Sequence, residues 1–219
     1  NISSSMPDRP GYNAHVPSTS AGAGHLPKAK QTLTPAAYPG GVPALVNPSA
    51  KPVPPFSMRY TVGNQLRQDT CNLFAQSMKQ LGITVNVSST DALGKTLTQS
   101  DAQHQWDIIV FAWVATPFPN SANQPIYTTA KQGTPLSNYG YYSNADVDKW
   151  LADATQNSDE KVRESDLNQS DAQVSKDAYT LPLYQKPTMI AYKNTLGNVR
   201  DNPQQIGPTY NIGEWGFKS

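Results

Sequence analysis

Cysteine, histidine and an excess of charge of either sign are what this sequence has least of. Among 219 residues there is a single cysteine, Cys71, which excludes an internal disulfide and any metal site built from several cysteines. We expect Cys71 to be a packed thiol rather than a nucleophile, because no histidine is near it in sequence. The three histidines are scattered without the spacing of metal ligands. Basic and acidic residues number 17 and 16 and form no basic cluster, so we expect no nucleic-acid partner.

Long apolar runs and catalytic motifs are absent from the sequence as well. No apolar run approaches the roughly 20 residues that cross a bilayer, and there is no cleavable leader. The chain has no Gly-x-Ser-x-Gly elbow, no phosphate-binding Gly-x-x-x-x-Gly-Lys-Ser/Thr loop and no dinucleotide-binding Gly-x-Gly-x-x-Gly. We therefore predict no catalytic residue, no metal and no cofactor, and a protein that is not an enzyme. Because the chain begins with Asn1 rather than methionine, we expect a fragment or a processed form.

The chain is organised around residues 106–113, which are almost wholly apolar and rich in β-branched and aromatic side chains. Such a run is too short for a buried helix and is typical of a strand covered on both faces, so we predict a central strand here. Pro117 and Pro119 then remove backbone donors and take the chain out of the sheet. Ligands of open α/β sheets bind beyond the carboxyl ends of strands, which indicates a site in the turn after Trp113. A core strand that ends in a rigid loop is the alternative interpretation.

The residues before this strand predict a β-α-β-α order that leads into it. Alternating apolar and polar residues predict strands over 56–62 and 83–87, and the crossover between them favours parallel pairing. Residues 65–81 predict a helix that ends at Gly82, and Asp91 is expected to cap a short helix that runs to about Ser100. The apolar face predicted for the first helix consists of Leu66, Leu73, Phe74, Met78 and Leu81.

Residues 1–56 have a different character from the rest of the chain. They contain 11 of the 19 prolines, with Ser, Gly and Ala, and show no extended apolar periodicity. This composition is typical either of a linker or of an irregular arm that packs on a folded surface. The only helix predicted within it is a short one near residues 27–37.

The second half of the chain predicts a loop, two helices and a tail. Residues 117–142 form a long loop rich in aromatic and amide side chains, suited to a polar organic ligand, although aromatics that pin the loop to a core are an equal alternative. Asn144 is expected to cap a helix, and residues 158–178 predict a weakly amphipathic helix exposed along the outside. Short extended segments at 181–184 and 189–192 precede a tail that closes on two aromatic residues. The face predicted for the helix after Asn144 consists of Val147, Trp150, Leu151 and Ala154.

Four stretches of the chain, taken in order, resemble one known family. Residues 66–87 are similar to a helix followed by "Leu-Gly-Ile-x-Val", and residues 106–117 to "Tyr-Asp-(apolar)-Gly-Trp-x-Ala-Asp-Tyr". Residues 138–148 resemble "Asn-Tyr-x-x-Tyr-Ser-Asn-Pro-x-Val-Asp", and residues 177–184 resemble "Asp-Ala-Pro-x-Ile-Pro-Leu-Tyr". The family is the extracellular solute-binding proteins of family 5, the peptide and nickel-type receptors of ATP-driven importers, and the resemblance covers roughly residues 56–193.

The resemblance implies a fold and a domain plan. Family members are two-lobed α/β clamps, so we expect a periplasmic-binding-protein-like (type II) α/β lobe with a mixed sheet flanked by helices, and this chain to be the carboxyl-terminal part. The expected divisions are an irregular Pro-rich arm over 1–56, the solute-binding lobe over 57–193, and a tail over 194–219 that returns toward the first lobe.

The resemblance also implies partners and a location. The expected partners are a small-molecule or peptide ligand, an ABC permease at the membrane, and the first lobe of the chain's own full-length protein, which would act as a monomer. The expected location is extracytoplasmic, with a lipid anchor on the outer face of the cytoplasmic membrane. The ligand site implied by the motifs and the loop consists of Trp113, Thr116, Phe118, Asn120, Tyr139 and Tyr141.

One departure from the family pattern bears on the ligand. In many peptide-binding members the acid after "Trp-x-Ala" pairs with the ligand's α-amino group, whereas this chain has Thr116 there. A buried ammonium without a counter-charge is costly, so we expect a free peptide amino terminus not to be held here in the usual way. A few actinobacterial lipoproteins of this family serve cell-envelope glycolipid assembly. A regulatory envelope lipoprotein that binds a protein or a glycolipid and transports nothing is therefore the second hypothesis.

Overall fold

The computed structural model describes residues 13, 26–27, 29, 54–98, 106–114, 124–130, 137–184, 187–202 and 204–218. The chain divides into two compact units, one over Ser18–Ala112 and the other over Trp113–Ser219 together with Asn1–Pro17. Residues 26, 27 and 29 are helical, and the rest of the short helix expected near residues 27–37 lies outside the described residues. Within the described part of the chain, no helix is both long and apolar enough to cross a lipid bilayer.

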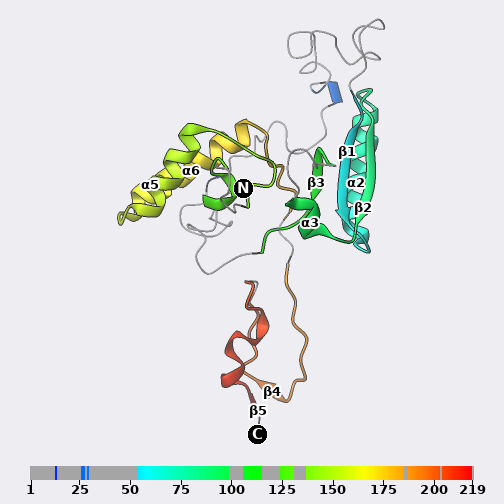
Figure 1. The fold of residues 1–219 in the computed structure, drawn as a ribbon. Coiled ribbons are helices and arrows are strands. Elements are labelled where there is room, and N and C mark those ends of the chain that lie inside the picture. The colour runs from blue at the N-terminus through cyan, green and yellow to red at the C-terminus, as the bar shows by residue number, and fades with distance from the viewer. Residues whose placement is uncertain are drawn as a thin grey trace, which may run out of the picture. The chain divides into compact units, whose positions relative to one another are not determined.

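The Ser18–Ala112 unit contains a three-stranded parallel sheet with α2 packed alongside it (Figure 1). The predicted β-α-β-α-β order and its parallel pairing are confirmed. The expected central strand, however, is not central: the strand order is β2-β1-β3, so β1 lies in the middle. The elements are β1 (Phe56–Thr61), α2 (Gln65–Lys79), β2 (Val85–Thr90), α3 (Leu93–Leu97) and β3 (Ile108–Val110).

The strand β3 is shorter and less covered than its composition indicates. Only Ile108–Val110 pair with β1, and the residues from Ala112 to Val114 are exposed. An apolar run signals burial without saying which strand of a sheet has neighbours on both sides. Asp107 joins the start of this pairing, because its side chain accepts a 2.6 Å hydrogen bond from the Ser57 amide and its own amide donates to the Ser57 carbonyl at 2.9 Å.

Helix α2 begins and ends as the sequence predicts, but it buries a different face. Asn64 caps it by accepting from the Arg67 amide, and Gly82 follows with a φ of +74°. Leu66 and Leu73 are 54% and 64% exposed, so the prediction that they share the buried face is wrong. With 3.6 residues per turn, they lie about a third of a turn away from the inward-facing side chains. Those inward side chains are Cys71, Phe74 and Met78, and they pack in the cores beneath the sheet.

Cys71 is fully buried against Met58 and Tyr60 of β1, and burial raises the pKa of its thiol. The prediction of a packed thiol is therefore confirmed.

Two boundaries in this unit differ from expectation because local caps take the backbone. The strand predicted over 83–87 is observed as β2, over Val85–Thr90, since the Ile83 amide still donates to the Met78 carbonyl at the end of α2. Asp91 does not cap α3, whose N-cap is Ala92 without a side-chain hydrogen bond. The Thr90 hydroxyl instead accepts from the Ala92 amide at 3.2 Å. The helix also ends at Leu97, short of the expected Ser100.

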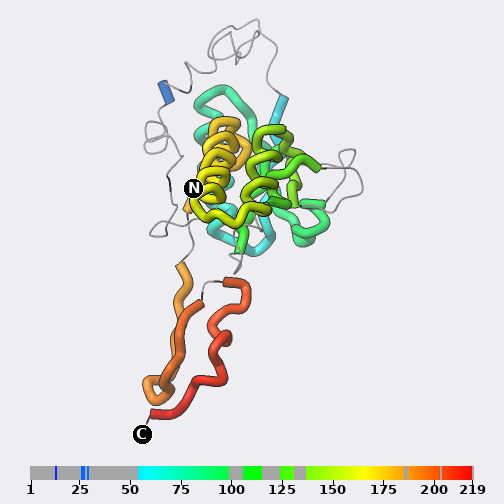
Figure 2. The backbone as a smooth tube through the Cα atoms, turned by 90° about the vertical axis from the view of Figure 1, so that its left-hand side faces the viewer, coloured from blue at the N-terminus to red at the C-terminus, as the bar shows by residue number. Residues whose placement is uncertain are grey.

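The Trp113–Ser219 unit contains two helices, α5 (Ala145–Gln156) and α6 (Glu160–Lys176), which lie side by side (Figures 1 and 2). Asn144 caps α5 as predicted and accepts from the Asp146 and Val147 amides. The prediction that α6 lies exposed along the outside is wrong. Its buried face includes polar residues, which hid the amphipathic pattern from the sequence. The buried residues of α6 are Leu167, Ser170, Asp171 and Val174.

The core between these helices is completed by tyrosines from outside them. Tyr127, from a short helical turn over residues 124–127, and Tyr142 are buried with the inward residues of both helices. The segments at residues 181–184 and 189–192, expected to be extended, belong to no strand ladder among the described residues, and Met189 is almost fully exposed.

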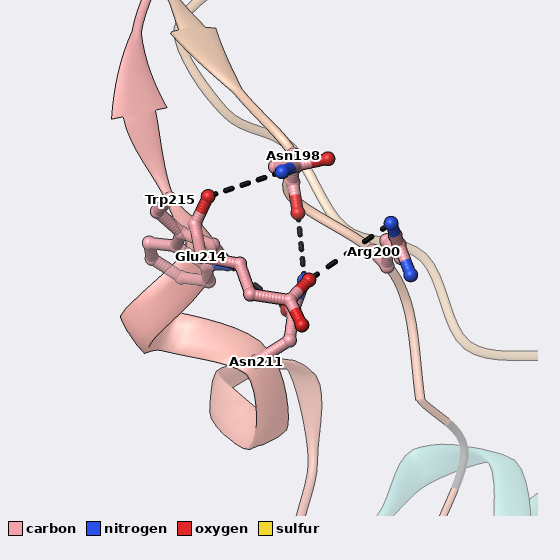
Figure 3. Close-up of polar contacts among 5 residues, drawn as sticks. All are labelled: Asn198, Arg200, Asn211, Glu214 and Trp215. Atoms are coloured by element: carbon pink, nitrogen blue, oxygen red, sulfur yellow. Dashed lines mark hydrogen bonds and ion pairs between the residues drawn. The ribbon is translucent and has the colours of Figure 1, made fainter.

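The tail is held together by polar contacts among its own residues, which Figure 3 shows. Strands β4 (Leu196–Gly197) and β5 (Gly216–Phe217) pair antiparallel on either side of the 3₁₀ helix η2 (Pro208–Glu214). The Asn211 amide donates to the Asn198 carbonyl at 2.8 Å and its carbonyl accepts from the Trp215 indole at 3.0 Å. Of the two terminal aromatics expected to need a surface, Trp215 is thus held within the tail, while Phe217 is exposed.

Candidate functional site

Trp113 and Tyr139 stack face to face in the Trp113–Ser219 unit. Their ring centroids are 5.8 Å apart and their planes differ by only 9°. Trp113 remains 48% exposed, so the pair is an aromatic surface that solvent reaches rather than a core contact. The sequence singles out both residues for a ligand site, from two different motifs, and the structure brings them together. We call this pair the aromatic platform.

The turn that carries Tyr139 is closed by the side chain of Asn138, which is almost fully buried. Its amide group donates to the Thr128 carbonyl at 2.9 Å and to the Tyr142 carbonyl at 2.8 Å. Its side-chain oxygen accepts from the Tyr142 amide at 2.9 Å. Because one asparagine satisfies backbone groups on both sides of the turn, the segment from residue 138 to residue 142 has a defined conformation.

Tyr141 lies in the same turn with a strained backbone. Its φ is +55°, a left-handed conformation that costs a non-glycine residue roughly 1–2 kcal/mol. Its ring is 44% exposed. Residues held in such conformations concentrate at functional sites, because the surrounding structure must hold them there. The position of Tyr141 next to the aromatic platform therefore supports its predicted place in the site.

The turn is joined to the end of α6 through Asp177. The Tyr142 hydroxyl donates to the Asp177 carboxylate at 2.6 Å, and Gln173 donates to the other carboxylate oxygen at 2.8 Å. These hydrogen bonds, that from Tyr142 above all, lower the pKa of Asp177. Burial, and then the hydrogen bond to Asp177, raise the pKa of Tyr142. The tyrosine is thus held neutral as a donor and the aspartate ionised as an acceptor.

Tyr179 supports the turn from below. Its ring is tilted against that of Tyr142, with centroids 4.9 Å apart, and meets the ring of Tyr127 edge-on at 6.2 Å. Its hydroxyl donates to the Asn138 side-chain oxygen at 3.1 Å and accepts from the Gly140 amide at 3.0 Å. Tyr179 was not among the site residues predicted from the sequence. The signal that could have identified it is its departure from the proline of the quoted "Asp-Ala-Pro" pattern.

The remaining predicted site residues, Thr116, Phe118 and Asn120, lie outside the described residues. Their place in the site therefore stays a prediction. What the described part of the site offers chemically is an exposed π surface on a rigid turn, onto which a planar or apolar group of a ligand can pack.

Comparison with known proteins identifies the class. The sequence profile of the bacterial extracellular solute-binding proteins, family 5 Middle, matches residues 2–135. The oligopeptide-binding protein AppA of Bacillus subtilis (strain 168) is 24% identical over 160 residues, which are 73% of this chain and 28% of AppA. The structure of the periplasmic EDTA-binding protein EppA superposes with a TM-score of 0.82 at 25% identity, over 98% of this chain and 39% of EppA. The oligopeptide-binding protein from Thermus thermophilus, complexed with a pentapeptide, gives 0.75 at 19% identity, over 99% and 39%.

The fold is therefore that of the type II periplasmic binding proteins, as predicted. The chain belongs to the bacterial extracellular solute-binding proteins of family 5. It spans 28% of the length of AppA and 39% of that of EppA. The matched range begins at residue 2, so the family pattern extends into the Pro-rich arm as well as over the sheet.

Proposed function

We propose that this chain is the carboxyl-terminal part of an extracytoplasmic solute-binding protein, which captures its ligand in a two-lobed cleft and delivers it to an ABC importer. The observation that carries the proposal is the exposed Trp113–Tyr139 stack, held on a closed turn, in a chain of this family. In this proposal the arm over 1–56 and residues 57–193 belong to one lobe. The tail over 194–219 returns toward the other lobe, and a lipid anchor holds the protein at the membrane.

The ligand surface of this lobe consists of the aromatic platform together with Tyr141 and, from the neighbouring loop, Thr116, Phe118 and Asn120. The platform supplies apolar contact and the loop supplies hydrogen bonds, as in other ligand sites that combine aromatic walls with a few polar groups. These residues bind rather than react, so the protein is not an enzyme in this proposal.

The ligand class follows from the relatives and from Thr116. The relatives include proteins described as binding oligopeptides, which favours a peptide. A hydroxyl at position 116 cannot neutralise an ammonium, which favours a ligand without a free α-amino group at this point. A peptide anchored elsewhere and a sugar or lipid headgroup are the two ligands compatible with both observations.

Native mass spectrometry of the full-length protein from its own host tests the proposal. A co-purifying small molecule or peptide, released on unfolding and identified by fragmentation, is the expected result. An empty protein that co-purifies with a protein partner would contradict solute capture. That outcome would favour a regulatory envelope lipoprotein, the second candidate, which Thr116 also allows because it removes the usual peptide anchor. Genes for a permease and an ATPase beside this one would favour import.

A further inference from the structure

We propose that Tyr179 is a positioning residue for ligand recognition: it holds Tyr139 in place against Trp113 by gripping the two residues that flank Tyr139 in the chain. The inference rests on the proposed function, because it takes the aromatic platform as the ligand surface. It adds a residue that makes no contact with the platform's outer face and that sets the platform's geometry from beneath.

The grip uses both hydrogen-bonding roles of one hydroxyl. The Tyr179 oxygen accepts from the Gly140 amide at 3.0 Å, on one side of Tyr139, and donates to the Asn138 side chain at 3.1 Å, on the other. A tyrosine hydroxyl has one proton, so donating to Asn138 fixes the direction from which it accepts. The two contacts together fix the peptide planes on either side of Tyr139, and with them the direction of its ring.

The close approach of Tyr179 depends on glycine at position 140. A Cβ atom on residue 140 would lie 2.6 Å from the Tyr179 oxygen, 2.8 Å from its Cε2 and 3.1 Å from its Cζ. The first two distances are shorter than side chains tolerate, so any other residue at position 140 would push the ring away. Gly140 and Tyr179 therefore form a matched pair, with the ring of one lying in the space that the other leaves open.

Tyr179 is itself held firmly enough to serve as a support. Its ring contacts Tyr142 and Tyr127, both buried in the core between α5 and α6. It follows α6 after only two residues, Asp177 and Ala178, and Asp177 is bonded to Tyr142. The position of Tyr139 is thus referred to the helical core and not to the loop alone, which is the arrangement that preorganised binding surfaces require.

The experiment compares Tyr179→Phe with Tyr192→Phe in the full-length protein labelled with 5-fluorotryptophan. The ¹⁹F resonance of Trp113, assigned by its absence from Trp113→Phe, reports the ring of Tyr139 stacked on it. Tyr139→Ala gives the reference shift for a lost stack. We expect Tyr179→Phe to move the resonance toward that reference, and Tyr192→Phe, which removes one hydroxyl from an exposed tyrosine, to leave it in place. A lower melting temperature of Tyr179→Phe with an unmoved Trp113 resonance would overturn the inference.

A second measurement separates failure of this inference from failure of the proposed function. The probe is an equimolar mixture of pentapeptides, with binding followed by native mass spectrometry. We expect Trp113→Ala and Tyr179→Phe each to weaken capture at least threefold, with Tyr192→Phe unchanged. If Trp113→Ala weakens capture and Tyr179→Phe does not, the positioning role is wrong and the proposed site stands. If neither weakens capture while the resonance of Tyr179→Phe moves, the support is real and the platform is not the ligand surface.

The matched pair offers a test that does not depend on the hydroxyl. Gly140→Ala is expected to shift the Trp113 resonance, and adding Tyr179→Ala should relieve the collision, so that the double variant melts at a higher temperature than the sum of the single effects gives. Additive melting temperatures would contradict the pairing.

Discussion

The hydroxyl of Tyr142 donates a 2.6 Å hydrogen bond to Asp177, and this contact joins the turn before α5 to the end of α6. The two residues are 35 positions apart in the chain. Because Tyr142 also forms part of the core, the contact links the packing of the helices to the conformation of the turn that carries Tyr139 and Tyr141.

The first prediction concerns acid stability. Hydrogen bonds from Tyr142, Gln173 and Asn144 lower the pKa of Asp177 in the folded protein. The stability that they contribute is therefore fully present above the ordinary aspartate range, near pH 4, and is lost as the pH falls through the lowered folded-state pKa. Thermal melts between pH 7 and pH 2.5 should show a smaller acid-induced drop in melting temperature for Asp177→Asn than for the parent. Asp91→Asn, at an exposed aspartate, serves as the control and should retain the full drop.

The second prediction concerns strain at Tyr141. Tyr141→Gly removes the penalty of a positive φ and is expected to raise the free energy of unfolding by about 1 kcal/mol, since glycine adopts this conformation freely. Under the proposed function the same variant binds ligand more weakly. Denaturant unfolding and ligand capture measured on one preparation would show the opposite signs. A variant less stable than the parent would mean that contacts of the Tyr141 side chain outweigh the strain.

The third prediction concerns Trp113. Trp113→Ala removes one half of the aromatic platform and is expected to weaken ligand binding more than tenfold in the full-length protein. Tyr184→Ala is a suitable control, because it deletes an exposed aromatic side chain elsewhere in the same unit. Affinity measured by titration calorimetry with the ligand identified by mass spectrometry checks the prediction, and unchanged affinity would remove Trp113 from the site.

The fourth prediction concerns the buried face of α6. Leu167 is buried in the core between the helices, so Leu167→Ala should lower the free energy of unfolding by about 2–5 kcal/mol. Val162, on the same helix, is exposed, and Val162→Ala should change it by less than about 0.5 kcal/mol. Urea unfolding of both variants is the measurement. Equal, small effects would mean that α6 lies on the surface, as its sequence pattern indicated.

Local signals in the sequence predicted the elements well, and long-range ones were out of reach. The Asn144 cap and the turn at Gly82 follow from the chemistry of single residues beside a helix end, and both are observed. The position of β3 at the side of the sheet depends on which strands pair, which an apolar run does not encode. The burial of α6 was hidden because Ser170 and Asp171 share its inward face.

The candidate site divides along the same line. Trp113 and Tyr139 are conspicuous aromatics in quoted motifs, so the sequence could name them, although not their stacking. Tyr179 could not be named, because its partner Asn138 lies 41 residues away and the contact exists only after α5 and α6 have folded between them. The space at Gly140 that admits its ring is likewise a property of the folded turn.

The carboxylate of Asp107 has a consequence for how the sheet assembles. By accepting from the Ser57 amide, it gives β1 and β3 one alignment in which a charged side chain takes the place of a ladder partner. Sliding the strands by two residues would keep every side chain on its proper face, so hydrophobic burial alone hardly distinguishes that alignment from the native one. The slipped pairing would leave the carboxylate without this donor, and Asp107 therefore selects a single alignment where burial permits several.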